Sequence, residues 1–419
     1  MQFLTPFLIM TIAVLTLSCE VKDRTKYRWE EIPTHSKHGG EPNLHVAANG
    51  DVIISWLEYD KDKVSLLFSK MDGDNNQLRE WSKPKLIASG DNWFVNWADF
   101  PSLASYRGNT KGYMASHWLQ KSAEGTYDYD VKVSQSRDAG ESWEEPFVIH
   151  DDGISAEHGF VSLLPLNSGH LFVTWLDGRN TKLENANLNS DEGHLHHGAM
   201  SLRASEIDIN GTKYYDEEID NKVCDCCQTS AAMTDKGPVV VYRNRSDGEI
   251  RDIYISRREN GKWLQAHSVH NDRWEINGCP VNGPVVVAQD SMVAVAWFTM
   301  AHQDPQVLVA FSYDNGDNFG IPIKIDNGNP MGRVDLLKVN DQEVLVSWVE
   351  YNQDDAAVVM LCRVHKSKGV LDKLPLFTTD KSRQSGFPRI EFVRDDLIVA
   401  WTTVDSVASV KSGILKGVK

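Results

Sequence analysis

A short apolar run that ends in an aromatic residue recurs seven times in this chain of 419 residues. Repeats of roughly 40 to 60 residues, built from several short strands, are typical of β-propeller blades. The intervening runs are rich in Val and Ile and are bounded by Gly, Asn or Asp, as short strands usually are. The sequence therefore predicts an all-β fold, a β-propeller of four-stranded antiparallel blades. Seven blades are expected, and six is the alternative if one unit is an insertion. The recurring aromatic residues are Trp56, Trp118, Trp175, Tyr242, Trp297, Trp348 and Trp401.

Each unit has the same internal order of segments. A first strand, often opened by proline, is followed by a turn, the strand that ends in the aromatic residue, and two further strands. The last unit stops after its third strand, at residues 407–415. We expect residues 27–32 to supply its fourth strand, because such a closure removes an open sheet edge and joins the chain ends. Residues 27–419 are therefore predicted to form a single propeller domain.

The first 18 residues are apolar and uncharged, and Cys19 follows them. The run is short for a membrane span and lies at the N-terminus, which indicates an export signal. Leu17-Ser18-Cys19 resembles the end of a bacterial lipobox, whose cysteine is lipidated. We therefore expect a lipoprotein signal peptide at 1–18, lipidation at Cys19 and a polar tether at 19–26. The protein would be an outer-membrane or cell-surface lipoprotein, or periplasmic, with a lipid anchor as its only membrane contact.

The formal net charge is −16 at pH 7. So acidic a chain is a poor partner for nucleic acid, and none is expected. An anionic ligand would need a local basic pocket. A monomer is expected.

Two turns that follow a third strand carry the pattern Ser-x-Asp-x-Gly-x-x-aromatic, from Ser136 to Trp143 and from Ser312 to Phe319. Ser and Asp side chains can bond the amides of such a turn, and glycine can adopt a positive φ. The pattern resembles the Asp-box, or bacterial neuraminidase repeat, of sialidase-like propellers. The resemblance implies a secreted or surface propeller of a kind that often acts on glycans. The boxes themselves are expected to be structural.

Chemically unusual residues gather on one predicted face of the propeller. Strand direction alternates within a blade, so the segment that leads into strand one and the loop between strands two and three share a face. We call this the site face and the leading segment the lead-in. Functional residues commonly lie on such loops of a rigid scaffold. Its tryptophans could stack on sugar rings or pack between blades; they are Trp93, Trp97 and Trp274.

The cysteines suggest either a disulfide or a metal site. Cys362 lies in an apolar strand and is expected to be a core thiol. Cys227 and Cys279 occupy matching lead-ins of neighbouring blades. An exported protein could join Cys226 or Cys227 to Cys279 as a disulfide. The alternative is a zinc or copper site, with help from histidines of a nearby loop. Its candidate ligands are Cys224, Cys226, Cys227 and Cys279, with His194, His196 and His197.

Arginines also concentrate on the site face. Planar guanidinium groups bind carboxylate or sulfate bidentately, so a converging set would form an anion pocket in this acidic protein. Alternatively, each arginine pairs with a nearby acid. The candidate substrate-binding residues are Arg179, Arg243, Arg245, Arg251, Arg333 and Arg389.

The same face offers acid–base groups. Glycoside hydrolysis uses a pair of carboxyl groups, or a tyrosine nucleophile in sialidases. A lyase acting on a uronic acid would need a His or Tyr base beside an arginine. The candidate catalytic residues are Asp99, His158, Asp177, Tyr242 and Asp247.

Three functional hypotheses follow. The first is an exported enzyme of glycoside hydrolase type that binds and cleaves an acidic glycan at an arginine-rich mouth. The second is a non-catalytic propeller that binds glycan, protein or metal. The third is a uronic-acid polysaccharide lyase. A carboxyl pair, or a His or Tyr beside an arginine, in one deep pocket would favour an enzyme. Arginines that are all paired internally would favour a binding protein.

Overall fold

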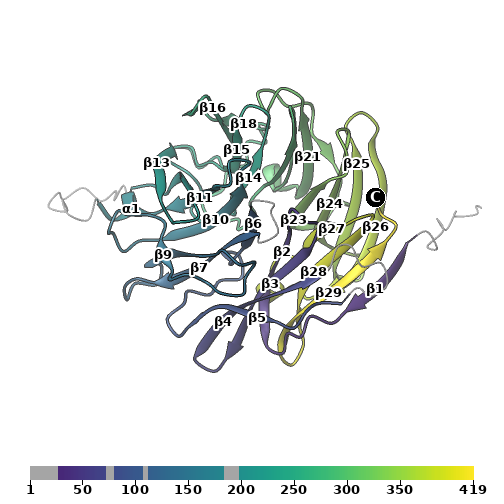
Figure 1. Cartoon of the computed structure of the whole chain (residues 1–419). Helices are drawn as coiled ribbons and strands as arrows, with labels where there is room; N and C mark the ends of the chain where they lie inside the picture. Colours follow the sequence, from purple (N-terminus) through teal and green to yellow (C-terminus); the bar gives the residue numbers. More distant parts are fainter. Residues whose placement is uncertain (1–26, 72–79, 107–111, 184–197) are drawn as a thin grey trace, which may run out of the picture.

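The structure is a computed structural model that describes residues 27–71, 80–106, 112–183 and 198–419. The described chain forms seven antiparallel sheets arranged around a common axis (Figure 1). The predicted seven-bladed propeller is therefore confirmed. The predicted signal peptide, Cys19 and the tether, together with His194, His196 and His197, lie outside the described residues.

The first three blades follow one another along the chain, and each contributes four strands in sequence order. Blade 1 contains β2 (Gly39–Val46), β3 (Val52–Asp60), β4 (Lys63–Met71) and β5 (Lys85–Gly90). Blade 2 contains β6 (Leu103–Tyr106), β7 (Tyr113–Lys121), β8 (Tyr129–Ser136) and β9 (Phe147–Val148). Blade 3 contains β10 (His158–Pro165), β11 (Leu171–Asp177), β12 (Ser201–Ile207) and β13 (Lys213–Asp220), and the short helix α1 (Arg179–Leu183) follows β11.

Blades 4 to 6 repeat this order, and in blade 4 two short segments share the outer position. Blade 4 contains β14 (Ser230–Met233), β15 (Pro238–Arg243), β16 (Ile253–Glu259), β17 (Lys262–Trp263) and β18 (His267–Ser268). Blade 5 contains β19 (Val285–Gln289), β20 (Met292–Thr299), β21 (Gln306–Ser312) and β22 (Ile323–Lys324), with a 3-10 turn, η3 (Ala301–Gln303). Blade 6 contains β23 (Pro330–Lys338), β24 (Glu343–Tyr351), β25 (Ala357–His365) and β26 (Gly369–Thr379).

Blade 7 joins the two ends of the described chain. It contains β27 (Arg389–Val393), β28 (Asp396–Val404), β29 (Ala408–Lys416) and β1 (Arg28–Ile32), and the 3-10 turn η4 (Arg383–Ser385) precedes β27. β1 pairs with β29 in antiparallel register from Arg28 opposite Lys416 to Ile32 opposite Ser412. This confirms that residues 27–32 supply the missing strand. The Trp81 indole of blade 1 also donates to the Ser412 hydroxyl at 2.8 Å, so blades 1 and 7 are linked by side chains as well.

The recurring aromatic residues lie in the second strand of every blade and form the core between sheets. Trp56, Trp175, Trp297 and Trp348 have no exposed surface. Neighbouring Val and Ile residues are buried on both faces of these strands, because each sheet packs between two others. The short apolar runs in the sequence therefore become central strands.

The two serine–aspartate turns have the geometry that their chemistry predicts. In the first, the Ser136 hydroxyl accepts from Gly140 N at 2.8 Å, and Asp138 accepts from Ser142 N at 2.9 Å. Gly140 has a φ of 85°, which a residue with a β-carbon rarely adopts. Ser312 and Asp314 make the equivalent bonds in blade 5. The serine and aspartate side chains therefore stabilise the turns.

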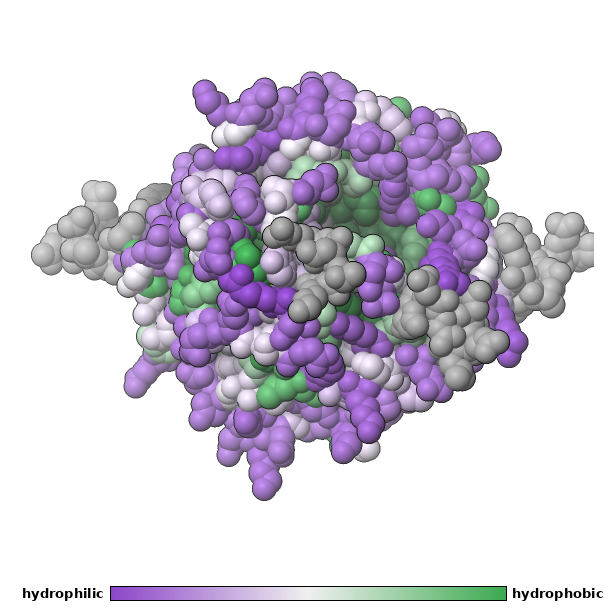
Figure 2. Space-filling model, viewed as in Figure 1, coloured by the Kyte–Doolittle hydropathy of each residue, from purple (hydrophilic) through white to green (hydrophobic). Residues whose placement is uncertain are grey.

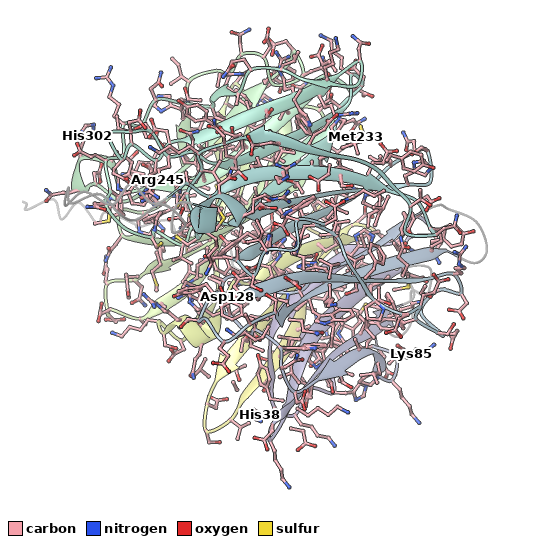
Figure 3. All side chains as sticks on the ribbon, turned by 90° about the vertical axis from the view of Figure 1, so that its left-hand side faces the viewer. His38, Lys85, Asp128, Met233, Arg245 and His302 are labelled. Carbon is pink, nitrogen blue, oxygen red and sulfur yellow. The ribbon has the colours of Figure 1, made fainter. Side chains whose placement is uncertain are left out.

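The two faces of the propeller are distinct in side view. Arg245 and His302, which lie in loops after second strands, are on the left in Figure 3, and Met233 and Lys85 are on the right. Viewed as in Figure 1, the surface is mostly hydrophilic, with apolar side chains in a hollow near its centre (Figure 2). None of the helices in the described part of the chain has the length and apolar content that a membrane span requires.

Candidate functional site

The first strands of the blades surround an axial cavity of about 210 Å³, and lead-ins meet at its site-face end. Gln228 of blade 4 donates to the Ala98 carbonyl of blade 2 at 2.6 Å and accepts from Gly283 N of blade 5 at 2.9 Å. Trp97 stacks on Phe387 of blade 7, with ring centroids 5.6 Å apart. Four blades are thus joined across the axis, and the neighbouring functional groups have fixed positions.

A hydrogen-bonded cluster of two carboxyl groups and a tyrosine lies where blades 2 and 3 meet. The Tyr129 hydroxyl is 3.2 Å from Asp99 Oδ2 and 3.0 Å from Glu157 Oε1. A phenol has one hydrogen to donate. If both contacts are hydrogen bonds, one carboxyl group must therefore be protonated. Asp99 also accepts from Phe160 N at 2.7 Å.

Burial favours the protonated form of both acids. It raises the pKa of Asp99 to about 7. Burial likewise raises the pKa of Glu157 to about 8, and the charges of Asp99 and Asp225 add to the effect. Asp99 and Tyr129 are buried, whereas Glu157 is only partly buried. Glu157 is therefore the member of the cluster that a ligand could reach.

A second carboxyl group, Asp225, lies in the lead-in of blade 4, close enough for its charge to act on Glu157. Arg245 Nη1 is 3.3 Å from Asp225 Oδ2, and Arg245 Nη2 is 2.8 Å from Glu249 Oε1. All three side chains are partly exposed: Asp225 by 35%, Arg245 by 27% and Glu249 by 26%. Glu157, Asp225 and Arg245 thus form an accessible acidic group with one cation, which we call the carboxyl pair site.

The predicted residues His158, Asp177 and Arg179 do lie together, but inside an ionic network. His158 Nε2 is 3.0 Å from Asp152 and 3.6 Å from Asp177. The Arg179 guanidinium contacts Asp177 at 2.7 Å and Asp152 at 3.2 Å. The two aspartates and His158 are close enough to hold a metal ion, but Arg179 and His158 already pair with both carboxylates. Their arrangement indicates a structural junction.

Tyr242 and Asp247 are not brought to this cluster. The Tyr242 hydroxyl is buried and donates to Asp220 at 2.6 Å. Asp247 is 99% exposed and pairs with Lys222 at the loop surface. Neither lies in the group formed by Asp99, Tyr129 and Glu157.

Most of the predicted substrate-binding arginines use their N–H groups in hydrogen bonds and ion pairs within the protein. Arg243 is 1% exposed and donates to the carbonyls of Asn282, Arg251 and Phe298. Arg251 contacts Glu249 at 2.7 Å and Cys224 Sγ at 3.3 Å. Arg389 pairs with Asp335 at 3.3 Å.

Arg333 differs from these arginines. It donates to Ser385 Oγ at 2.6 Å and to the Ser382 carbonyl at 3.0 Å, and no carboxylate of the described residues forms a salt bridge with it. Burial lowers the pKa of Arg333 to about 10. Its backbone has a φ of 56°, a strained conformation that often occurs at functional sites. Its guanidinium lies 5.3 Å from the Trp97 ring, and the exposed Arg383 lies 5.9 Å from the same ring.

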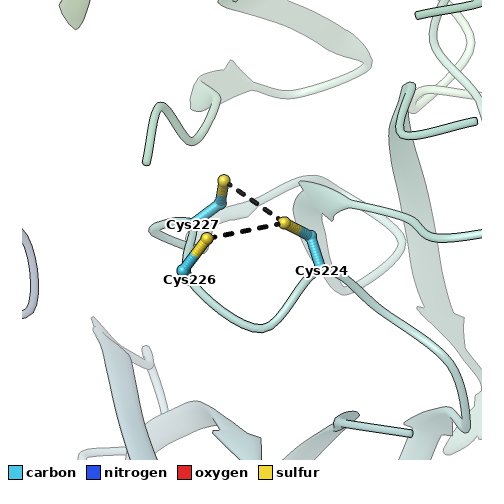
Figure 4. A group of neighbouring side chains, drawn as sticks. All are labelled: Cys224, Cys226 and Cys227. Atoms are coloured by element: carbon cyan, nitrogen blue, oxygen red, sulfur yellow. Dashed lines mark hydrogen bonds between the residues drawn. The ribbon is translucent and has the colours of Figure 1, made fainter. Parts of the chain in front are cut away.

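Three of the four candidate metal-ligating cysteines, Cys224, Cys226 and Cys227, come together, and no disulfide joins any cysteine that the structure describes. Cys224 Sγ is 3.9 Å from Cys226 Sγ and 3.6 Å from Cys227 Sγ (Figure 4). Cys279 of blade 5 interacts with the Cys226 thiol. Cys224 N donates to the Arg243 carbonyl at 2.9 Å, so the lead-in of blade 4 is held against the loop that follows β15.

The candidate site lies in or beside segments that the sequence analysis singled out, but several of its members were not among the predicted site residues. Glu157 precedes the predicted His158, and Asp225 lies between two of the predicted cysteines. Tyr129 begins β8 and has no local signal, because its partners come from the lead-ins of blades 2 and 3. Arg383 precedes β27 in a polar segment that shows no repeat.

No family model matches the chain, and no curated protein matches it in sequence. Among solved structures, it is similar to the phage phi92 endosialidase, with 12% identity over 93% of this chain and 69% of that chain and a TM-score of 0.50. It is also similar to an ulvan lyase of polysaccharide lyase family PL25, with 11% identity over 91% of this chain and 95% of that chain and a TM-score of 0.55. At such identities the likeness shows the fold, a β-propeller.

We expect Glu157 to make stability depend on pH. Between the ordinary glutamate pKa of 4.5 and about 8, the folded protein binds a proton at Glu157 that the unfolded chain does not. This stabilisation is complete below pH 4.5 and is lost as the pH rises through 8. The stability of the wild type relative to Glu157→Gln should therefore fall over this window in thermal denaturation. Parallel profiles would contradict the expectation, and Glu31→Gln, an exposed glutamate of β1, is the control.

Proposed function

We propose that this chain is a carbohydrate-processing enzyme that binds an acidic glycan on the site face and cleaves it with Glu157 as the proton donor. The observation that carries the proposal is a partly buried carboxyl group, held through Tyr129 to Asp99, with a second accessible carboxyl group, Asp225, close enough for its charge to act on Glu157. Paired carboxyl groups of this kind are what most glycoside hydrolases use.

The roles follow from the surroundings of each group. Glu157, with a pKa of about 8, carries a proton at neutral pH and can give it to the oxygen of the leaving sugar. Asp225 supplies the second carboxyl group, to activate water or to attack the sugar. Arg245 holds Asp225 by a salt bridge. Asp99 and Tyr129 are positioning residues, because both are buried behind Glu157.

The preference for an acidic glycan rests on Trp97 and the two arginines beside it. A buried guanidinium without a carboxylate partner is costly, and an anionic ligand would compensate Arg333. Arg383 is exposed, and no salt bridge to it is seen among the described residues. Two proteins of similar fold are named an endosialidase and an ulvan lyase, the latter also solved with the fragment -[GlcA(1-4)Rha3S]- bound, which supports this ligand class by analogy.

A non-catalytic glycan-binding propeller is the second candidate. It is favoured by the internal pairing of Arg179, Arg243 and Arg251, which leaves fewer cations for a substrate than the sequence predicts. A polysaccharide lyase is the third candidate, and the assay described next distinguishes it from a hydrolase by its products.

Glu157→Gln is expected to lower turnover about 10²- to 10⁴-fold, the usual contribution of a general acid. The assay presents sialylated oligosaccharides, polysialic acid and ulvan, and detects new reducing ends and the ultraviolet absorbance of unsaturated ends. Asp247→Asn, which removes an exposed carboxylate from the same face, should retain full activity. Unsaturated products would identify a lyase. Binding without turnover of any of these glycans would support the second candidate and overturn the enzyme.

Arg383→Ala is expected to weaken binding of a uronic-acid oligosaccharide about two- to fivefold, as loss of an exposed ion pair would. Binding of the carboxyl-reduced, neutral form should not change. Calorimetric titration at low and high salt measures both, and the difference should shrink as salt rises. Lys381→Ala is the matched control, because this exposed lysine already pairs with Asp355 at 3.0 Å. Equal losses for both ligands would contradict a role in charge recognition.

We further propose that the protein is exported and lipidated at Cys19, on the basis of the apolar run that precedes this residue. Cys19→Ser should abolish incorporation of a labelled fatty acid and release the protein from the membrane fraction. Undiminished labelling in this variant would refute lipidation at Cys19.

A further inference from the structure

Three thiols from the lead-in of blade 4 converge on one point (Figure 4). The Sγ atoms of Cys224, Cys226 and Cys227 all lie within 4.8 Å of one another. Cys224 and Cys227 are buried. The carboxyl pair site does not use these sulfur atoms, so their convergence needs a separate explanation.

The spacing of the sulfur atoms fits a shared metal ion. Tetrahedral zinc bound by thiolates at about 2.3 Å would place its sulfur atoms about 3.8 Å apart. The distances from Cys224 Sγ to the two other sulfur atoms, 3.9 Å and 3.6 Å, lie on either side of this value. A disulfide would require about 2.05 Å.

A fourth thiol comes from the next blade. Cys279 lies in the lead-in of blade 5 and is exposed. Its thiol is near that of Cys226 but is not within 4.8 Å of all three other sulfur atoms, so this exposed side chain would have to turn toward them to bind the same ion. Four thiolates would complete the coordination of a structural zinc ion. They would also join two blades at the rim of the site face.

The surroundings can compensate the charge of such a centre. A divalent ion with four thiolates is dianionic, and groups that bond the ligands orient them and tune the metal. Arg251 Nη1 is 3.3 Å from Cys224 Sγ and is 3% exposed, although it also pairs with Glu249. Arg243 is close enough for its charge to act on Cys224 and Cys227. One buried guanidinium group, that of Arg251, therefore contacts the sulfur cluster, and the charge of a second acts on it from a greater distance.

We propose that Cys224, Cys226, Cys227 and Cys279 bind one soft metal ion, zinc or copper(I), in a structural centre that joins blades 4 and 5. Each ligating thiol loses its proton on binding, since the thiolate is the ligand. The centre fixes Asp225, which lies between Cys224 and Cys226 in the chain, and through it Arg245. The metal proposal does not depend on the glycan proposal.

The test is the metal content of the full-length protein, purified under reducing and oxygen-free conditions. Elemental mass spectrometry should find about one zinc or copper per chain and tell the two apart. Cys226→Ser and Cys279→Ser should each lose most of it. Cys362→Ser is the matched control, because this buried thiol lies in β25, in another blade, and should leave the content unchanged.

Two further measurements keep the proposal falsifiable if a cysteine variant folds poorly. Titration of the metal-free wild type with cadmium should produce a thiolate charge-transfer band that saturates at one equivalent. Arg251→Lys should weaken zinc binding about 10- to 100-fold, as loss of an outer-shell partner typically does. Absence of bound metal and of the cadmium band would overturn the proposal. So would an intact mass that is lower by two hydrogens, with peptides linked between Cys279 and Cys226 or Cys227, because that result shows a disulfide.

Discussion

The pairing of β1 with β29 is the constraint on which the rest of the propeller depends. Each sheet buries its two faces against its neighbours, so an open ring would leave the first and last sheets half exposed. The five-residue ladder from Arg28 to Ile32 closes that gap, and the Thr34 hydroxyl adds a bond of 2.6 Å to the Val410 carbonyl. Closure holds the first strands around one axis. Only then do lead-ins that are far apart in sequence meet, as Ala98, Gln228 and Gly283 do.

The same crowding explains why an arginine-rich face does not make a large basic pocket. A guanidinium group near the axis is surrounded by carbonyls and acids of two or three blades, and a buried charge must be compensated. Arg243 satisfies its donors on blade 5 carbonyls and stacks at 4.8 Å on Trp274, which makes it a connector between blades. Arg333 and Arg383 are the departures from this pattern, and they lie against one tryptophan. Anion recognition is therefore better assigned to that pair than to the whole set.

The fold could be predicted from the sequence because the number of blades follows from counting repeated apolar strands and turns. A central strand needs an apolar run, and its end needs a turn, so Trp56 to Trp401 mark every sheet. Closure by residues 27–32 followed from counting strands. The site could be predicted only to the level of segments. The sequence does not tell whether Glu157 or its neighbour His158 faces a ligand. The strand that follows them has a bulge between Gly159 and Ser162, and Tyr129 of another blade holds the Glu157 side chain. Such contacts between blades leave no pattern in a single sequence.

The position of Asp225 links the two proposed sites physically. Its backbone is held between Cys224, whose amide bonds to the Arg243 carbonyl, and the two cysteines that follow. A loop residue placed by one salt bridge would be poorly oriented, because an exposed ion pair contributes little. A metal ion bound by the flanking thiolates would restrict the same backbone far more strongly, since it joins the lead-ins of two blades. The cysteine cluster would therefore supply the rigidity that a second catalytic carboxyl group needs, although the sulfur atoms themselves take no part in proton transfer.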